Sequence, residues 1–201
     1  SDWEAYKNHL REMLGQETKL TRTLHATAAL HPQRVVFAEG GHPTMMKAAV
    51  QAHQEGICHP ILLGNPDRLN RMAKRLKLDL TGIEIVDMRA DKEQGNRATY
   101  AKHLAEKRAR QGVTFEEAYD KMYERNYFGM SMVEQGDADA FVTGLYTKYS
   151  NTIKVAKEVI GIRKDYNTFA TMHILNTKKG VFYLADTLIN RHPDQNVLYD
   201  V

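Results

Sequence analysis

A loop rich in hydroxyl and amine side chains is the strongest candidate for chemistry in this sequence. It spans residues 143–151, follows an apolar run and precedes a helical pattern. Backbone N–H groups at such a junction can face an anion, and lysine side chains can supply positive charge. A nucleotide or CoA phosphate would suit this loop, and the alternative is an ordinary polar connection. The candidate binding residues of the loop and the following helix are Thr143, Gly144, Tyr146, Thr147, Lys148 and Lys154.

Two further positions could bind an anion. The turn at residues 39–41 ends another apolar run, which is where open α/β sheets bind ligands, and Gly40 is the candidate there. The alternative is a simple strand-to-helix turn. Arg125 could clamp a phosphate or carboxylate, because a guanidinium binds these groups with two hydrogen bonds. A surface ion pair with Glu124 or Asp120 is the alternative for Arg125.

Two clusters of charged residues are better explained by structural roles than by a binding or catalytic role. Asp137 and Asp139 could ligate a metal, but carboxylates at a strand start more often accept backbone N–H groups. Five basic residues on one helix face could attract a polyphosphate, although a solvated face is the more common role. They are Arg68, Arg71, Lys74, Arg75 and Lys77. The sequence has no GxGxxG fingerprint, HExxH motif or nucleophilic serine elbow, so we assign no catalytic residue and no metal ligand.

Composition narrows the class of protein. In 201 residues, 28 Lys and Arg against 25 Asp and Glu give a net charge of +3, which by itself implies no nucleic-acid partner. The single cysteine, Cys58, excludes an internal disulfide; it could be a reactive thiol, but a buried apolar role is favoured. No apolar run approaches the ~20 residues of a membrane span, and no signal peptide is present, so we expect a cytoplasmic protein.

These candidates must be positioned by alternating strands and helices. Apolar runs predict strands at 34–38, 60–64, 83–87, 139–144, 168–175 and 180–185, the last two joined as a hairpin. Helical periodicity predicts helices at 3–14, 20–30, 43–53, 66–76, 94–111, 114–135 and 151–160. Thr114 and Glu117 fit a capping box. The alternation predicts an α/β fold with a mostly parallel sheet flanked by helices. A further helix is expected after residues 186–194, and the elements up to Val201 suggest a truncated fold.

Several short motifs occur together in a fixed order. They are Arg34-Val-Val-Phe-Ala-Glu-Gly, Pro60-Ile-Leu-Leu-Gly, Tyr127-Phe-Gly-Met-Ser-Met-Val, Gly136-Asp-Ala-Asp, Ala185-Asp186, Asn190 and His192-Pro-Asp194. In order and spacing they resemble the phosphate acetyl/butyryl transferase family, from about Arg34 to the end of the chain. The resemblance implies a two-lobed fold like that of isocitrate and isopropylmalate dehydrogenases. It implies a helical leader at 1–31 and an incomplete phosphotransacetylase-like domain at 32–201, whose second lobe begins near residue 165.

A second set of motifs indicates a subgroup. They are Asp2-Trp-Glu-Ala-Tyr-Lys-Asn-His-Leu, Arg110-Gln-Gly-Val-Thr, Lys148-Tyr149 and Val159-Ile-Gly-Ile-Arg163. These look like the C-terminal phosphotransacetylase-like domain of bacterial NADP-dependent malic enzymes. The resemblance implies that acetyl-CoA, or a related acyl metabolite, binds as a regulator and that the protein forms a homo-oligomer, at least a dimer. It places NADP and the divalent metal, Mg or Mn, in an N-terminal malic enzyme domain and none of them in this segment.

The sequence departs from the family in the candidate loop. Where active transferases have small hydroxyl residues, this chain has two tyrosines, a lysine and an asparagine, and Lys154 replaces an arginine. The family's Ser-Arg and Asp catalytic group falls beyond Val201 and is assigned to no residue here. Three hypotheses follow: a regulatory acetyl-CoA-binding domain without catalysis, an active phosphate acetyltransferase, and a structural dimerisation module without a ligand.

Overall fold

The computed structural model describes residues 19–177 and 179–201, and the chain divides into two compact units. One unit is His31–Gly161. The other contains the described residues up to Leu30 together with Ile162–Val201. The helix predicted at residues 3–14 lies outside the described residues.

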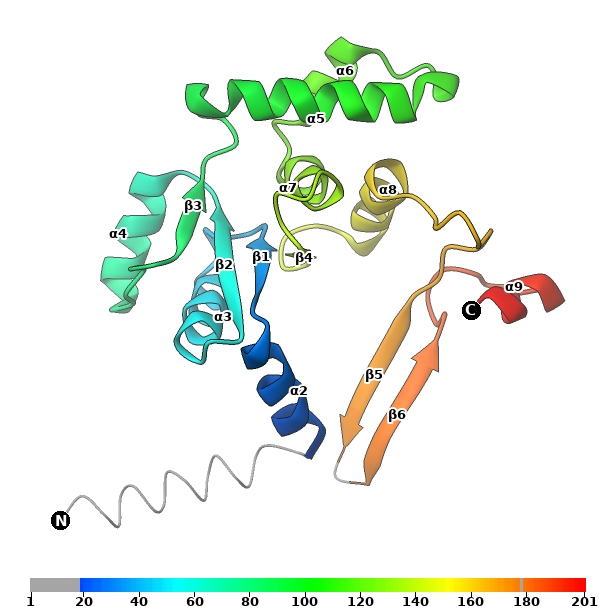
Figure 1. The fold of residues 1–201 in the computed structure, drawn as a ribbon, viewed down its shortest axis with the longest axis horizontal. Helices are drawn as coiled ribbons and strands as arrows, with labels where there is room; N and C mark the ends of the chain where they lie inside the picture. Colours follow the sequence, from blue (N-terminus) through cyan, green and yellow to red (C-terminus); the bar gives the residue numbers. More distant parts are fainter. Residues whose placement is uncertain (1–18, 178) are drawn as a thin grey trace. The chain divides into compact units, whose positions relative to one another are not determined.

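The larger unit is built on a parallel four-stranded sheet in the order β3-β2-β1-β4 (Figure 1). Its strands are β1 (Gln33–Phe37), β2 (Cys58–Leu63), β3 (Glu84–Val86) and β4 (Ala140–Val142). All three pairings are parallel, with Phe37 opposite both Leu62 and Val142. Parallel strands require crossover connections, and here helices supply them. The predicted α/β class with a parallel sheet is confirmed.

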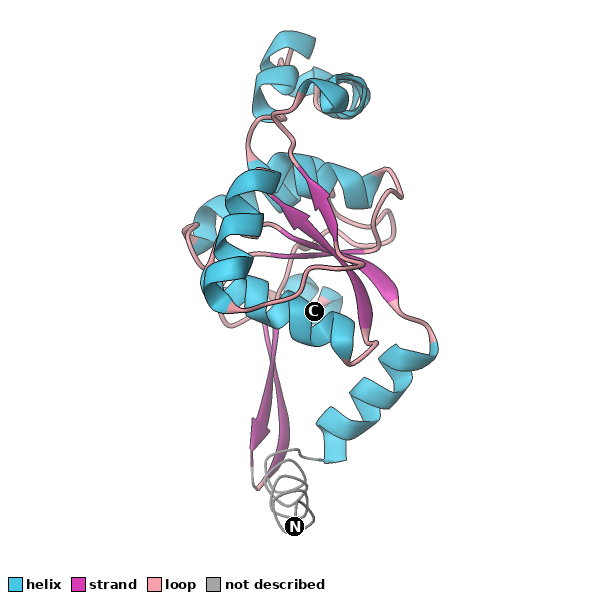
Figure 2. Cartoon of the chain, turned by 90° about the vertical axis from the view of Figure 1, so that its left-hand side faces the viewer, coloured by secondary structure: helices cyan, strands magenta, loops and turns pink. Residues whose placement is uncertain are grey.

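Helices cover both faces of this sheet (Figure 2). They are α3 (Pro43–Gln54), α4 (Pro66–Leu76), α5 (Gln94–Lys107), α6 (Phe115–Lys121), α7 (Arg125–Glu134) and α8 (Tyr149–Val159), with short 3-10 turns at Asp91–Glu93 and Ala109–Gln111. Side chains alternate along each strand, so Ile61 and Leu63 join one core cluster while Leu62 joins the other. The first cluster packs under α5–α8 and the second under α3 and α4. This double burial explains why the strands are continuous apolar runs.

Local signals set most of the helix ends. Pro43 and Pro66 stand in the first turns of α3 and α4, where a missing N–H is tolerated. Thr114 and Glu117 form the predicted capping box at the start of α6. These ends match the sequence predictions, because capping depends on residues only a few positions apart.

The single helix predicted over residues 114–135 is wrong. The chain breaks between α6 and α7, and Glu124 takes an extended backbone conformation (φ −95°, ψ 130°). Met122, at the end of α6, is fully buried, and Arg125 begins a new helix beside the sheet. Burial in the tertiary structure therefore overrides a helical pattern that continues through the break.

Gly129 allows α7 to pack closely against the sheet. A Cβ added at Gly129 would clash with the Phe141 ring and lie 3.1 Å from Cδ1 of Leu63. We expect Gly129→Ala to lower the free energy of unfolding by about 1–3 kcal/mol, because overpacking displaces core side chains. Gly95→Ala is the control, since a Cβ there meets nothing within 4 Å. Urea denaturation should separate the two variants, and equal stabilities would contradict this packing.

The smaller unit contains α2 (Lys19–Leu30), an antiparallel hairpin of β5 (Met172–Thr177) and β6 (Gly180–Ala185), and α9 (Gln195–Asp200). The predicted hairpin and final helix are present, although β5 begins at Met172 and not at residue 168. Asn190 Nδ2 donates a hydrogen bond to the Phe169 carbonyl at 3.2 Å, and Asp200 accepts from the Asn167 N–H and the Thr168 hydroxyl. These contacts tie the loops on either side of the hairpin and α9 together.

The thiol of Cys58 is buried, and burial raises its pKa. A raised pKa disfavours the reactive thiolate, so the apolar role expected for Cys58 fits the structure. Among the described residues, no helix is both long and apolar enough to cross a membrane.

Candidate functional site

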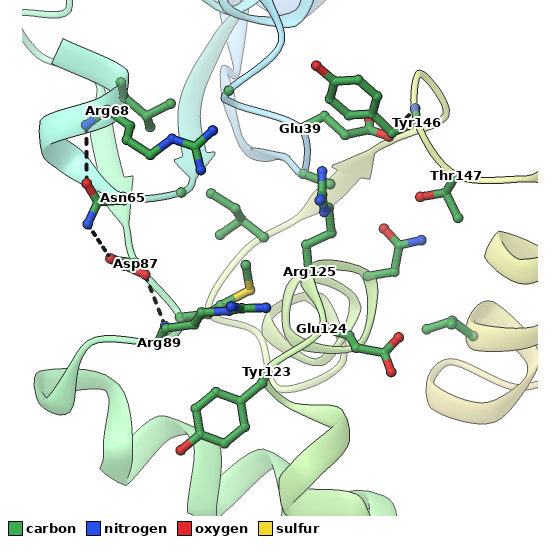
Figure 3. A pocket seen from close by; sticks show the side chains of 18 of the residues that line it. Glu39, Asn65, Arg68, Asp87, Arg89, Tyr123, Glu124, Arg125, Tyr146 and Thr147 are labelled. Atoms are coloured by element: carbon green, nitrogen blue, oxygen red, sulfur yellow. Dashed lines mark hydrogen bonds between the residues drawn. The ribbon is translucent and has the colours of Figure 1, made fainter. Parts of the chain in front are cut away.

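A pocket of about 870 Å³ opens at the carboxyl edge of the parallel sheet (Figure 3). Residues that follow all four strands contribute to it, together with the beginnings of α4, α7 and α8. Its principal polar residues are Glu39, Asn65, Arg68, Asp87, Arg89, Glu124, Arg125, Asn126, Tyr146, Thr147 and Asn151. The carboxyl edge of an open parallel sheet is where ligands of this fold class bind, and helix N-termini there favour anions.

Hydrogen bonds join the loops after β2 and β3 on one side of the pocket (Figure 3). Asn65 caps α4 by accepting from the Arg68 N–H at 3.2 Å, and its amide donates to Asp87 Oδ2 at 3.2 Å. Asp87 Oδ1 in turn accepts from the Arg89 N–H at 3.1 Å. These bonds bring Arg68 and Arg89 to the same wall of the pocket.

Three guanidinium groups border the pocket: those of Arg68, Arg89 and Arg125. None of them forms an ion pair with a carboxylate of a described residue. The carboxylates of Asp87, Glu39 and Glu124 also border the pocket; those of Asp87 and Glu39 accept backbone N–H groups, and the exposed Glu124 pairs with none of the three arginines. The guanidinium groups therefore keep their donors available for an anionic ligand.

Tyr146 lies against His42 and against the pocket residue Arg125. Its ring lies edge-on to the His42 ring with centroids 5.0 Å apart, and the Arg125 guanidinium carbon is 5.8 Å from its centroid. Tyr146 is 61% exposed, so the ring is held at the opening instead of being buried in the core. An aromatic face beside a cation at this opening suits a planar or acyl group that carries negative charge nearby.

Glu39 lies under the loop that follows β4 and is only 1% exposed. Its carboxylate accepts backbone N–H groups from Gly144, Leu145 and Tyr146 at 3.0–3.3 Å. Sequence reasoning selected Gly40 in this turn and missed Glu39, because a glutamate after an apolar strand carries no local sign of a partner 105 residues away. The only available signal was the acidic residue at a strand end.

Arg97 was also missed, and it forms the wall behind the loop after β3. It is 3% exposed, and its Nη1 donates to the carbonyls of Met88 and Ala90 at 2.7 and 2.8 Å. Its guanidinium also lies 4.8 Å from the Tyr123 ring centroid. Met88 and Tyr123 both line the pocket, so Arg97 fixes the position of this wall.

Of the eight binding residues proposed from sequence, Arg125, Tyr146 and Thr147 line the pocket. Thr143 and Gly144 act one step behind it, since the Thr143 hydroxyl donates to Asn126 Oδ1 at 3.2 Å and the Gly144 N–H donates to Glu39. The ion pair considered for Arg125 with Glu124 or Asp120 does not form.

The other three proposed residues lie beside the pocket without lining it. Gly40 has no room for a side chain, because an added Cβ would lie 2.9 Å from the Leu63 carbonyl oxygen. Lys148 is the N-cap residue of α8, and Lys154 pairs with Glu158 at 3.9 Å.

The two aspartates considered as metal ligands have structural partners. Asp139 forms a salt bridge with Arg34 at 2.9 Å and accepts the Arg34 N–H, and Asp137 accepts the Tyr100 hydroxyl. Within residues 19–177 and 179–201, no group of three His, Cys, Asp or Glu side chains could hold a metal ion. The structural role favoured for these aspartates fits these contacts.

Helix α8, which carries Asn151 and Val155 into the pocket, is anchored from two sides. Lys107 donates to the Val159 and Ile160 carbonyls at 2.6 and 2.9 Å, which satisfies the C-terminal end of the helix. Glu158 accepts from Tyr127 at 2.6 Å and from Lys121 at 3.0 Å. These contacts set the position of α8 relative to α5 and α7.

Glu158 makes this anchor sensitive to acid. Burial raises its pKa, but hydrogen bonds from Tyr127 and Lys121 outweigh burial and hold the pKa below its ordinary value. A lowered folded-state pKa stabilises the fold above the unfolded value of about 4.3, and this stabilisation is lost as pH falls through the folded value. We expect Glu158→Gln to lower stability by about 1–2 kcal/mol at pH 7, with the difference from wild type shrinking in acid. Denaturation at several pH values measures this, with exposed Glu106→Gln as control; a pH-independent difference would contradict it.

Comparison with known proteins identifies the family. The family model described as phosphate acetyl/butaryl transferase matches residues 19–201. The chain belongs to this family. The resemblance drawn from the motifs is thereby confirmed, and the pocket lies within the matched region.

Two kinds of family member are similar over most of this chain. The NADP-dependent malic enzymes of Escherichia coli (strain K12) and Rhizobium meliloti (strain 1021) are 27% and 31% identical over 100% of the chain. The phosphate acetyltransferase of Salmonella typhimurium is 31% identical over 84% of the chain. The chain spans about a quarter of the length of these relatives, 27%, 26% and 23% respectively.

A solved family structure shares the fold. The EutD phosphotransacetylase from Staphylococcus aureus has a TM-score of 0.77 and 23% identity, covering 89% of this chain and 53% of that chain. A phosphotransacetylase from Streptococcus pyogenes gives a TM-score of 0.75 at 22% identity. The phosphotransacetylase fold expected from the motifs is therefore confirmed.

Proposed function

We propose that this chain is the phosphotransacetylase-like region of an NADP-dependent malic enzyme, where it binds acetyl-CoA or a related acyl-CoA as a regulator and transfers no acyl group. The pocket carries this proposal. It combines three guanidinium groups that form no ion pair with any described carboxylate, several helix N-termini and an exposed aromatic ring at one sheet edge. A CoA thioester offers phosphates for the guanidinium groups and an acyl-pantetheine arm for the apolar and aromatic surface.

The comparisons support a malic enzyme as the parent protein. Both malic enzymes align over the whole chain, whereas the Salmonella typhimurium phosphate acetyltransferase aligns over 84% of it. On this proposal an N-terminal domain oxidises and decarboxylates malate with NADP and Mg or Mn. The assembled protein is a cytoplasmic homo-oligomer, at least a dimer, in which neither nicotinamide nor metal binds within these residues.

The altered loop supports binding without transfer. Transfer of an acetyl group between CoA and phosphate depends on close positioning of two bound substrates and on stabilising charge at the reacting carbonyl. Tyr146 places a large ring at the opening of the pocket, next to His42 and Arg125. This ring leaves less room for a second substrate beside a bound thioester.

Regulation requires that acetyl-CoA bind two states of the enzyme with different affinities, because only a differential affinity can shift an equilibrium. Such coupling typically changes affinity by about 5- to 150-fold. The fraction of the parent enzyme in each state would then depend on the acyl-CoA concentration, and the rate of malate oxidation would measure this change.

The test uses the intact protein and acetyl-CoA. We expect calorimetry to detect binding, malate-dependent NADPH formation to change with acetyl-CoA, and no acetyl phosphate to appear when acetyl-CoA and phosphate are supplied together. Formation of acetyl phosphate would support the active transferase instead. Absence of both binding and a rate effect would leave the structural dimerisation module as the remaining hypothesis.

A further inference from the structure

Glu39 contributes to the pocket through the loop above it. Three consecutive backbone N–H groups, those of Gly144, Leu145 and Tyr146, converge on its carboxylate. Oε1 accepts from Leu145 at 3.1 Å and from Tyr146 at 3.0 Å, while the Gly144 N–H is shared between Oε2 at 3.1 Å and Oε1 at 3.3 Å. Successive N–H groups arranged around one point form a concave anion-binding site, often called a nest.

A carboxylate that is 99% removed from solvent must have its hydrogen-bond acceptors satisfied, because burial of an unpaired polar group is unfavourable. The loop N–H groups supply hydrogen-bond donors to the Glu39 carboxylate, and the carboxylate supplies acceptors to these N–H groups. Their contact therefore works in both directions: the loop conformation depends on the carboxylate, and the buried carboxylate depends on the loop.

The sheet fixes the other end of this contact. The Ala38 N–H donates to the Val142 carbonyl at 3.0 Å, which continues the pairing of β1 with β4 up to the residue before Glu39. Gly40 then packs against the Leu63 carbonyl, where an added Cβ would lie 2.9 Å from the oxygen. The strands thus hold the backbone on both sides of Glu39. The Glu39 side chain in turn restrains the loop through its hydrogen bonds.

The loop in turn presents Tyr146 and Thr147 to the pocket. We propose that the Glu39 carboxylate is the anion bound by the 144–146 nest and that Glu39 is a positioning residue for the ligand site. This proposal rests on the proposed function only where it concerns acyl-CoA. The carboxylate holds the loop in its binding conformation before any ligand arrives. Preorganisation of this kind improves affinity by removing the entropy cost of ordering the loop during binding.

The test measures hydrogen exchange of the loop amides in the intact protein, together with acetyl-CoA binding. We expect Glu39→Ala to speed exchange in residues 143–147 by at least about tenfold, because each N–H loses a charged acceptor. Sodium formate should restore slow exchange in Glu39→Ala by occupying the vacated nest, whereas sodium chloride at equal ionic strength should not. Glu124→Ala is the control, since Glu124 is an exposed carboxylate of the same pocket without a hydrogen bond to the loop.

The outcomes separate this inference from the proposed function. Faster exchange that formate reverses supports Glu39 as the anion bound by the nest even if acetyl-CoA does not bind, in which case only the regulatory proposal fails. Unchanged exchange in Glu39→Ala overturns the inference whatever acetyl-CoA does. Faster exchange that formate leaves unaltered also overturns it, because the effect is then a general loosening of the loop.

A second variant covers the case in which Glu39→Ala does not fold. Exchange in α5, which lies away from the loop, reports global unfolding in the same experiment. Glu39→Gln keeps one oxygen that can accept from Leu145 and Tyr146 and, at 3.3 Å, from Gly144, but it replaces the nearer acceptor of Gly144 with an amide donor. We expect an intermediate loss of loop protection with normal exchange in α5, and full protection in Glu39→Gln would overturn the proposal.

Discussion

Replacing Arg97 with alanine is expected to lower the free energy of unfolding by about 3 kcal/mol, the largest effect on stability that we predict for a polar residue of this chain. Arg97 donates charge-assisted hydrogen bonds to the carbonyls of Met88 and Ala90 while almost fully buried. Alanine would leave both carbonyls without this donor and would open a cavity beside the Tyr123 ring.

Arg97→Lys should recover only part of this loss, because an ammonium group cannot reproduce the planar set of donors. Arg89→Ala provides the matched control, since Arg89 is an exposed arginine of the neighbouring loop, and we expect it to change stability by less than about 0.5 kcal/mol. Urea denaturation followed by circular dichroism measures all three variants. Equal stability of Arg97→Ala and wild type would show that Arg97 does not hold this wall.

Replacing Arg125 with alanine should weaken acetyl-CoA binding by about 10- to 100-fold, the loss expected for one charge-assisted hydrogen bond to an anionic group. Arg125 begins α7, lines the pocket, and forms no ion pair with a described residue that would neutralise it. Its guanidinium also lies against Tyr146, so alanine removes a neighbour of the ring as well as a charge.

Calorimetry of Arg125→Ala against Arg71→Ala isolates this effect. Arg71 is an exposed arginine of α4 that does not line the pocket, so both variants lose one positive charge but only one changes the site. Arg125→Lys should bind with intermediate affinity, because the charge remains without the paired donors. An equal loss in the two alanine variants would indicate attraction by net charge instead of contact in the pocket.

The position of Arg125 also decides between the two interpretations that the sequence leaves open, an anion-binding residue and a surface ion pair. A surface ion pair would have made Arg125 an ordinary solvated residue, and the structure instead directs it toward the pocket from the first turn of α7 (Figure 3). The break between α6 and α7 creates this turn. The break that makes the prediction of one continuous helix wrong is therefore also the feature that places Arg125 at the pocket.

The sequence by itself determined the α/β class, the parallel strands and most helix ends. It did so because apolar runs, the first-turn prolines Pro43 and Pro66 and the Thr114–Glu117 capping box are local patterns, which act between residues close in the chain. The family followed from motifs in a fixed order, and the loop after β4 was selected because its residue types suit an anion.

Only the tertiary structure decided which side chains meet at the pocket. Glu39 and the loop amides are 105 to 107 residues apart, and Arg97 reaches across to Tyr119 and Tyr123 of the following helical segment. No local pattern encodes such partners, because each is selected by the need to satisfy a buried polar group with whatever the fold brings near. Burial likewise broke the helix at Met122, where core packing outweighs the preference of neighbouring residues for a continuous helix.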